Sequence, residues 1–428
     1  ALTNSIGLWL LAEKDNTQEL VAKFLGNLSV TESSQTLETG PRGKEMDFPR
    51  DETSIYYGVA GKRQAVIYSL YEMISLEKQQ TLLLFSDEET SWMTGDPAFT
   101  KQWAALMFQL IARGHRIIII HTISRHLDEM LSAINQWMPL YMSGAIEPYY
   151  YPKKRDGVFA RTLFIAPGTM ALVSSSVGGE TAGAANVLHR NPSAVAAYEQ
   201  EFLQYLRLCQ PLMLIFTEKK MDTALLTLSE FEKESCNTLI KTEALSLLTM
   251  PQELFSQIIE RSGLDKEKFQ KYYRLRTENF RRLVRTNSFT EIVKLPKPQD
   301  IIAGQVKISL SGMMAGGSIS YTPREYLLHL QNIVGLLKMF ENYHVCLVQG
   351  PVEDRYTVYV KEERGAIIAK TSLPPVMLAM NESNMTASFW DFLKTMADER
   401  ILDNQDNKKA IQKLMEYIEQ LKELLSTQ

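Results

Sequence analysis

Two short apolar runs decide the fold class: Thr81-Leu-Leu-Leu-Phe85 and Arg116-Ile-Ile-Ile-Ile-His121. Each run has the length of a strand and is continuously apolar, which is typical of strands buried on both faces of a parallel sheet. The segment from about 98 to 113 has helical periodicity and separates the two runs, which gives a β-α-β order. We therefore expect an α/β protein with a parallel or mixed sheet covered by helices.

Further along, the sequence RTLFIAPGTMALVSSS at 161–176 predicts two paired strands, at 161–166 and 170–174. Pro167-Gly168 lies between them, where proline presets φ and glycine permits a tight backbone conformation. We therefore expect two adjacent central strands of the sheet joined by a turn at these two residues.

The length of 428 residues exceeds the size at which single cores stop growing, so more than one domain is expected. One stretch is rich in Ser, Thr, Glu, Gly and Pro and predicts a linker, and the region from about 220 to 290 has helical periodicity throughout. The expected order is N-terminal helices at 1–30, a linker at 31–54, an α/β domain at 55–218, a helical connector at 219–295, and a second α/β or α+β domain with a C-terminal helix at 296–428.

An internal echo links two parts of the chain. Residues 161–176 and 356–370 both predict strand, turn and strand, with Thr162 matching Thr357. An amphipathic helix and an apolar strand precede each pair, as LIARGHRIIII in the first and KMFENYHVCLV in the second, and an aromatic-rich helix follows each. The linkers differ in length, and such orders also recur by chance, so duplicated halves and coincidence both remain open.

A β-α-β unit followed by a strand pair that ends in small hydroxyl residues resembles the phospholipase D superfamily. In that family the strand pair carries H-x-K-x4-D and then Gly-Ser, on which Ser175-Ser176 can be laid. The His, Lys and Asp positions then hold Arg161, Leu163 and Gly168 in the first half and Tyr356, Val358 and Glu363 in the second. Because the family's His is the nucleophile and its Lys holds the phosphate charge, the resemblance implies a degenerate scaffold without that catalysis.

The stretches LFSDEETSWMTGDPAF (84–99) and YTPREYLLHLQNI (321–333) also look like the C-terminal, non-DNA-binding portion of bacterial helix-turn-helix transcriptional regulators. This resemblance implies the effector-binding or oligomerisation region of a cytosolic regulator. DNA would then be bound only through a domain absent from this chain. The chain opens at Ala1, without an initiator Met, and the loss of a preceding domain is one explanation of this start.

Composition and charge limit the kinds of partner that we expect for this chain. The net charge of −4 gives no overall attraction to nucleic acid or anionic lipid. The longest apolar runs, such as Ile117 to Ile120, are far shorter than a membrane span, and we expect a cytoplasmic protein with no membrane partner. Cys209, Cys236 and Cys346 are far apart and predict reduced thiols. No nucleotide-loop motif and no metal spacing among the histidines is present, so no cofactor or metal is expected.

Ligands of open α/β sheets collect beyond the carboxyl ends of the strands, so the polar residues there form the candidate site. These residues are Ser86, Asp87, His121, Ser174, Ser175 and Ser176. The three serines offer hydroxyl and backbone N–H groups that could cradle an anion, and we expect an unidentified small-molecule or anionic ligand. The alternatives are a plain polar loop and, for His121, a strand-end histidine with satisfied hydrogen bonds.

A second functional hypothesis is a divergent phosphodiesterase or other hydrolase acting at the same strand ends. Asp87, His121 and Ser175 would supply the orienting carboxylate, the base and the nucleophile, provided that the three side chains converge. A base must lie within hydrogen-bond reach, or one water, of the group whose proton it takes. The distance between His121 and Ser175 therefore decides this hypothesis.

Two helical segments raise the question of larger partners. The basic and aromatic segment 266–285 could grip phosphates or could be an ordinary solvated helix face. The final helix has an apolar stripe of interface quality, which predicts a homodimer or packing onto its own domain. The stripe comprises Ile411, Leu414, Tyr417, Ile418, Leu421 and Leu424.

Overall fold

The structure, a computed structural model, describes Val21, Ala22, Leu25 and, with gaps, residues 51–426. The gaps fall at 89–90, 122–136, 138–139, 142, 154–156, 243, 312–318, 349–355, 371–374 and 398–406. The chain divides into two compact units. Residues 32–215 form the N-terminal unit, and residues 216–428, together with residues 1–31, form the C-terminal unit.

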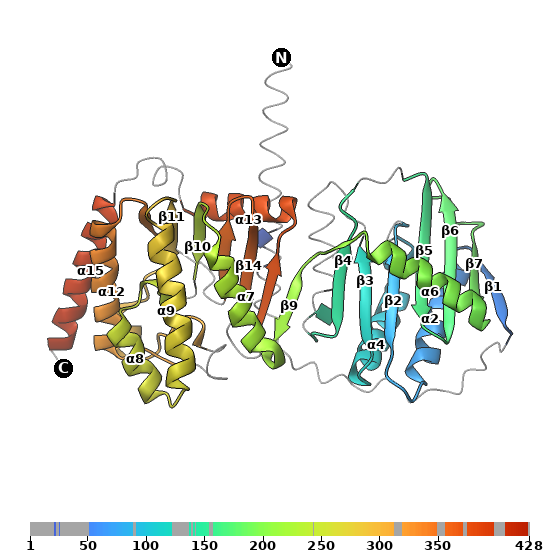
Figure 1. Ribbon diagram of the computed structural model, residues 1–428, viewed down its shortest axis with the longest axis horizontal. Coiled ribbons are helices and arrows are strands. Elements are labelled where there is room, and N and C mark those ends of the chain that lie inside the picture. Colours follow the sequence, from blue (N-terminus) through green and yellow to red (C-terminus); the bar gives the residue numbers. More distant parts are fainter. Residues whose placement is uncertain are drawn as a thin grey trace, which may run out of the picture. The chain divides into compact units, whose positions relative to one another are not determined.

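The N-terminal unit is built on an eight-stranded mixed sheet with the order β1-β7-β6-β5-β2-β3-β4-β8 (Figure 1). Strands β2, β3 and β4 run parallel, and β5, β6, β7 and β1 follow β2 as antiparallel neighbours. The strands are β1 (Thr53–Tyr57), β2 (Thr81–Ser86), β3 (Arg116–His121), β4 (Ile146–Tyr150), β5 (Phe159–Ala166), β6 (Met170–Val177), β7 (Ala185–His189) and β8 (Gln210–Pro211). The expected mixed sheet and its β-α-β start are confirmed.

Helices cover both faces of this sheet, which explains why β2 and β3 are apolar throughout. Helix α6 (Pro192–Leu206) packs on one face through Phe202, and α2 (Gly58–Ile74) packs on the other; Figure 1 shows α6 in front of the strands and α2 behind them. Helix α4 (Pro97–Ala112) packs beside α2, and the short α3 (Ser91–Thr94) precedes it. The predicted turn at Pro167-Gly168 is also confirmed, because β5 and β6 pair directly.

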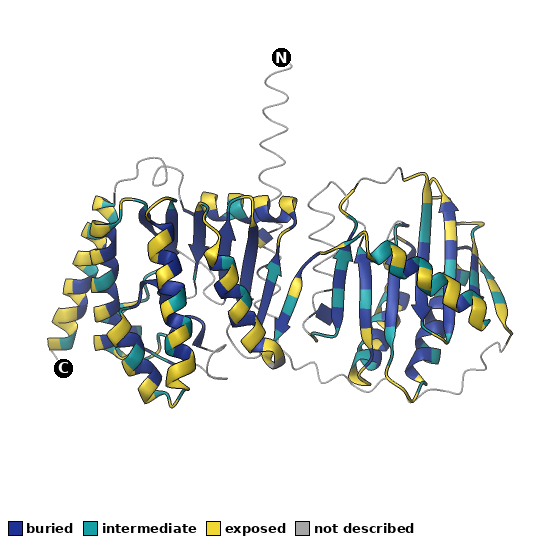
Figure 2. Cartoon of the chain, in the orientation of Figure 1, coloured by how far each residue is buried: buried dark blue, intermediate teal, exposed yellow. Residues whose placement is uncertain are grey.

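The C-terminal unit contains a seven-stranded mixed sheet with the order β12-β11-β10-β13-β14-β15-β9. Its strands are β9 (Leu214–Thr217), β10 (Thr238–Lys241), β11 (Phe289–Val293), β12 (Tyr343–Leu347), β13 (Tyr356–Lys361), β14 (Gly365–Lys370) and β15 (Val376–Met380). Its helices are α7 (Met221–Lys233), α8 (Gln252–Arg261), α9 (Lys266–Leu283), α10 (Pro298–Ile302), α12 (Pro323–Met339), α13 (Ser383–Met396) and α15 (Lys408–Ser426). Figure 2 shows the central strands buried and the outward faces of these helices exposed.

The two sheets have the same core topology. In each, three parallel strands are followed by an antiparallel hairpin and a further antiparallel strand, so β4-β3-β2-β5-β6-β7 corresponds to β12-β11-β10-β13-β14-β15. The internal echo is therefore present in strand order and direction. One match in the sequence comparison was wrong, because β12 corresponds to β4 and not to β3. The error arose because the parallel strand that directly precedes the hairpin in the first half, β4, is less apolar than β3.

The expectation of a purely helical connector at 219–295 is also wrong. That region contains β10 and β11, which are two of the three parallel strands of the C-terminal sheet. Each is only four or five residues long and lies between helices, so periodicity could not separate it from them. An isolated antiparallel bridge joins Lys307 and Ser320 further along the chain. The predicted linker overlaps β1 at Thr53 and Ser54, and its residues 31–50 lie outside the described residues.

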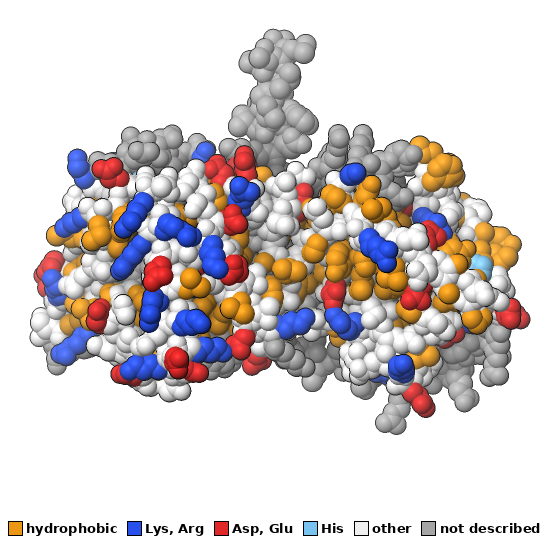
Figure 3. Space-filling view, viewed as in Figure 1, with side chains coloured by type: hydrophobic (Ala, Val, Ile, Leu, Met, Phe, Trp, Pro, Cys, Tyr) orange, Lys and Arg blue, Asp and Glu red, His pale blue; other side chains and the backbone are white. Residues whose placement is uncertain are grey.

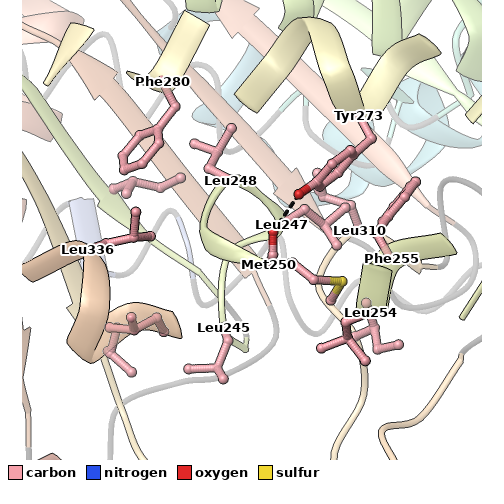
Figure 4. Close-up of a cluster of buried hydrophobic side chains, with 14 of the residues drawn as sticks. Leu245, Leu247, Leu248, Met250, Leu254, Phe255, Tyr273, Phe280, Leu310 and Leu336 are labelled. Carbon is pink, nitrogen blue, oxygen red and sulfur yellow. Dashed lines mark hydrogen bonds between the residues drawn. The ribbon is translucent and has the colours of Figure 1, made fainter. Parts of the chain in front are cut away.

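A large apolar cluster forms the core of the C-terminal unit around the loop from Leu245 to Met250 (Figure 4). Phe255 and Tyr273 stack with their ring centroids 4.3 Å apart. The Tyr273 hydroxyl donates to the carbonyl oxygen of Met250, so this buried phenol is satisfied. Helix α9 therefore contributes its aromatic side chains to the core.

The same packing weakens the nucleic-acid reading of α9. Tyr273 and Phe280 are buried, and Arg276 forms a buried bidentate ion pair with Glu232 of α7, so these groups are not available to bases or phosphates. Lys266 and Lys268 pair with acidic side chains at the surface. Figure 3 accordingly shows basic and acidic side chains interspersed over the face that carries α9. A solvated helix face describes this segment better than a phosphate grip.

The stripe of the final helix packs onto its own unit. Leu414, Ile418 and Leu421 are buried against the C-terminal core, where α15 contacts α12. Leu424, in contrast, is exposed. The apolar stripe therefore fixes α15 to its own unit, and self-association would have to use another surface. No helix among the described residues is apolar over a length that would cross a membrane.

Candidate functional site

The site begins with a lysine in an unexpected place. Helix α2 buries a face that includes Ala65, Ser69 and Met73, and Lys62 lies on this face one turn before Ala65. Only 2% of Lys62 is exposed, so its ammonium group must find partners inside the unit. Those partners are Thr162 of β5 and Glu88, which lies in the connection after β2.

The carboxylate of Glu88 is the centre of this polar cluster. Lys62 forms an ion pair with its Oε2, and the hydroxyl of Thr162 donates to the same oxygen at 2.7 Å. The other oxygen, Oε1, accepts from Ser176 at 3.0 Å and from Ser174 at 3.4 Å. Both carboxylate oxygens are thus engaged by scaffold donors, and we call these five residues the Glu88 cradle.

Strand pleating explains why the hydroxyls converge. In β5, Leu163 and Ile165 face α6, so Thr162 faces the opposite side, toward α2. In β6, the same alternation directs Ser174 and Ser176 toward α2. Thr162 and Ser174 are direct neighbours across the hairpin, which brings the donors together without any loop.

Burial controls the electrostatics of the cradle. Desolvation lowers the pKa of Lys62 to about 7, and the nearby Asp87 carboxylate acts in the opposite direction. The ion pair with Glu88 and the hydrogen bond to Thr162 at 2.8 Å also favour the protonated ammonium. In addition, Nζ lies 4.8 Å from the centroid of the Trp92 ring, so an aromatic face supports the cation from α3.

The sequence-predicted residues of β2 lie at the edge of the cradle. The Ser86 hydroxyl is 2.8 Å from Thr162 Oγ1, so Ser86 extends the hydroxyl network to a half-buried position. The Asp87 carboxylate instead accepts from the backbone N–H of Arg161, and its own N–H donates to the Arg161 carbonyl at 3.1 Å. Asp87 therefore continues the pairing of β2 with β5 by one residue, whereas Ser86 belongs to the hydrogen-bond network of the site.

His121 ends β3 on the same sheet face as the cradle, because Ile118 and Ile120 face α6. Its Nε2 lies 2.5 Å from the hydroxyl of Tyr141, and its ring meets Trp137 edge-on with centroids 5.8 Å apart. Burial lowers the pKa of His121 to about 4, so the imidazole is neutral near pH 7. This is a strand-end histidine held by aromatic neighbours.

The three serines of β6 divide between the two faces. Ser174 and Ser176 belong to the cradle, whereas Ser175 is exposed on the α6 side opposite Arg161. Ser175 is thus the one predicted site residue of β6 that the structure does not bring into the site. Its exclusion follows from the two-residue period of a strand.

This division overturns the catalytic trio of the hydrolase hypothesis. Ser175 and His121 face opposite sides of the sheet, and their strands are separated by β5 and β2. Three strand spacings correspond to roughly 14 Å, far beyond one bridging water. Asp87, His121 and Ser175 therefore do not assemble into a nucleophile, base and carboxylate.

The positions that correspond to the phospholipase D motif serve packing and surface roles. Leu163 packs in the core beneath α6, and Arg161 forms an ion pair with Glu201 of that helix, with an Nη2 to Oε2 distance of 3.0 Å. Gly168 occupies the hairpin turn with a φ of 69°, a conformation that favours glycine. In the second half, Tyr356 and Val358 are buried and Glu363 lies in the equivalent turn.

Among its described residues, the C-terminal unit does not repeat the cradle at the corresponding place. The hairpin registers match Thr162 to Thr357 and Ser174 to Ala369. Ala369 is buried and has no hydroxyl, and the Oγ1 of Thr357 has no hydrogen-bond partner within the described part of the chain. The polar cluster is therefore a property of one unit and not of the shared topology.

Sequence reasoning missed Lys62, Glu88 and Thr162 as site residues. A signal existed for Lys62, because a lysine on the otherwise buried stripe of α2 is unusual and calls for a partner. Thr162 was noted only as the counterpart of Thr357. Glu88 lies in a run of polar residues, and nothing local distinguishes it from a solvent-exposed acid. Among the described residues, no group of three His, Cys, Asp or Glu side chains could hold a metal ion.

Comparison with known proteins adds weak structural likenesses. No protein-family model and no curated protein matches the sequence. The archaeal chromatin protein TrmBL2 has a TM-score of 0.27 at 15% identity, over 49% of this chain and 66% of TrmBL2. The phospholipase D family member Nuc from Salmonella typhimurium has a TM-score of 0.25 at 13% identity, over 37% and 96%. NucT from Helicobacter pylori reaches 0.26 at 13% identity, over 37% and 98%. Scores this low assign no function to the chain.

Proposed function

We propose that the chain is the effector-binding region of a cytosolic bacterial transcriptional regulator, with the effector bound at the strand ends of the N-terminal unit. The observation that carries this proposal is the Glu88 cradle, a buried Lys62–Glu88 ion pair whose carboxylate accepts from three hydroxyls and at whose edge Ser86 contacts Thr162. Ligands of α/β sheets bind at this edge. The C-terminal sheet has the same topology, but Ala369 occupies the position that corresponds to Ser174. The fold itself therefore does not require the polar cluster.

A binding role also fits the state of each polar group. The hydroxyls of Thr162, Ser174 and Ser176 donate to a carboxylate that is neutralised by Lys62, and none of them is paired with a histidine of the described part of the chain. A histidine is the base that most often activates a serine nucleophile. The proposed ligand is a small organic molecule. DNA would be contacted by a domain outside this chain, because the aromatic side chains of α9 pack in the core and are not available to stack on bases.

A thermal-shift screen with organic acids, sugar phosphates and nucleotides tests the proposal. We expect at least one compound to raise Tm by several degrees, since a ligand stabilises the state that binds it. Ser86→Ala and His121→Ala should reduce that shift. Ser175→Ala is the matched control, because Ser175 faces the other side of the sheet, and it should keep the shift. A screen without a hit, or equal loss in Ser175→Ala, would contradict the proposal.

A further inference from the structure

The donors and the acceptor of the Glu88 cradle belong to different kinds of structure. Lys62 is part of helix α2, and Thr162, Ser174 and Ser176 belong to the β5–β6 hairpin. Glu88 alone lies outside helix and strand, in the connection that follows β2. The positive and hydroxyl groups are therefore fixed by regular backbone pairing, and the carboxylate is supplied by a connecting segment.

The cradle matches a single oxyanion in both charge and hydrogen bonding. One ammonium compensates one negative charge, and the hydroxyls supply donors to two oxygens. Burying an unpaired charge is costly, so a dianion such as a phosphate monoester would leave one charge uncompensated. A carboxylate or a phosphodiester presents two oxygens that share one negative charge, as Glu88 does.

The location of the cradle is the second argument. It lies at the carboxyl end of β2, where ligands of such sheets collect, and Ser86 links it to half-buried positions. A purely structural ion pair needs neither this edge nor three hydroxyls. The buried pair of Arg276 and Glu232, which joins two helices of the C-terminal unit, consists of a bidentate contact, with the ring centroid of Tyr272 5.2 Å from the guanidinium carbon.

We infer that the Glu88 cradle is an oxyanion-binding site that the chain fills with its own side chain, and that the carboxylate or phosphodiester group of the effector replaces Glu88 there. This inference rests on the proposed effector-binding function and names the chemistry of its ligand. Because Glu88 is tethered, its effective concentration at the site is high, in the millimolar range or above. An effector must outcompete it, and removal of Glu88 should make the site bind simple anions.

The test uses the full chain carrying Glu88→Ala, with sodium acetate and dimethyl phosphate as probes and sodium chloride as the ionic-strength control. We expect acetate, dimethyl phosphate or both to raise Tm and to bind at least tenfold more tightly than to the unaltered chain. The stronger of the two probes identifies the ligand class. Binding should weaken as pH rises through 7 and above, because a neutral Lys62 amine cannot pair with the anion.

Two further variants make the result specific. Lys62→Met combined with Glu88→Ala should abolish anion binding, and Ser175→Ala combined with Glu88→Ala should retain it. If Glu88→Ala does not fold alone, refolding that depends on acetate and not on chloride would support the inference, and Glu88→Gln then provides the binding measurement. Equal effects of acetate and chloride, or binding that survives loss of Lys62, would overturn it. The effector screen is independent, so this failure would leave the proposed function standing.

Discussion

The two sheets of this protein share a strand order and differ in what lies at their strand ends. In the N-terminal unit, Thr162 and Ser174 join Lys62 and Glu88 in a buried polar cluster. In the C-terminal unit, the hairpin places Ala369 opposite Thr357 instead. Backbone pairing can thus be kept while the side chains at one edge change from polar to apolar. Function is located by such side chains and not by the fold that carries them.

The C-terminal unit buries its charges elsewhere. Glu232 and Arg276 pair between α7 and α9, and Glu291 is buried in β11, where it accepts from the Tyr343 hydroxyl. Registers across the strands place Glu291 at the position of Ile119 in β3. Each unit therefore has its own buried polar chemistry on a common frame, and substitutions can separate the two.

The largest expected effect is on stability, and it tests whether the two units pack a helix on their common strand order in the same way. Phe202 of α6 and Phe389 of α13 are both fully buried, and each belongs to the helix that follows the last strand of the shared core topology, β7 or β15. Phe202→Ala and Phe389→Ala should each lower the free energy of unfolding by about 3–5 kcal/mol, through lost burial and a cavity. Urea denaturation measures this change. Phe159→Ala, at an exposed position, should stay within about 0.5 kcal/mol, and a similar loss there would refute the packing argument.

The next prediction compares the ion pair of Arg276 and Glu232 with the Glu88 cradle. Arg276→Met should cost at least about 3 kcal/mol, because it leaves Glu232 buried and unpaired. Adding Glu232→Leu should restore most of that loss, since an apolar pair can replace an isolated ion pair. Adding Glu88→Leu to Lys62→Met should restore much less, because three hydroxyls lose their acceptor. Equal recovery in the two double variants, measured by urea denaturation, would show that the clusters are alike.

A pH dependence should belong to the C-terminal unit. Burial raises the pKa of Glu291 from 4.5 to about 7, although the hydroxyl of Tyr343 acts in the opposite direction. The folded state then holds a proton that the unfolded state has released, so stability is full below pH 4.5 and falls as pH rises to about 7. The loss is at most about 3 kcal/mol, at 1.36 kcal/mol per unit. Denaturation between pH 4 and 8 should show this fall, and Glu291→Gln should flatten it. An unchanged slope in Glu291→Gln would assign the dependence to another group.

The smallest effect on stability concerns self-association, which we propose as a homodimer through the outer face of α15. Met415 is half-exposed there, whereas the inner stripe is occupied by the core. Met415→Glu should change the unfolding free energy by less than about 0.5 kcal/mol. It should nevertheless shift the mass measured by light scattering from dimer to monomer. Glu416→Gln, a neighbour on the same helix, is the control. A monomer mass for the unaltered chain would remove the proposal.

The sequence by itself determined the α/β class, the hairpin at Pro167-Gly168 and most long helices, because these depend on local periodicity and turn chemistry. It also singled out Ser86 and Ser174, which the structure places in the hydrogen-bond network around Glu88. These features need no knowledge of distant contacts. The echo of strand, turn and strand between the halves was visible for the same reason.

Only the tertiary structure decided the rest. Strands β10 and β11 are too short to be distinguished from the surrounding helices until they pair with β13 and β12. The division of Ser174 from Ser175 depends on which sheet face each strand turns toward α2. Lys62 and Glu88 are separated along the chain and meet because helix packing and strand pairing bring them together. Which residue pairs with a buried charge depends on the distance between the two side chains in the folded protein, and the local sequence does not show that distance.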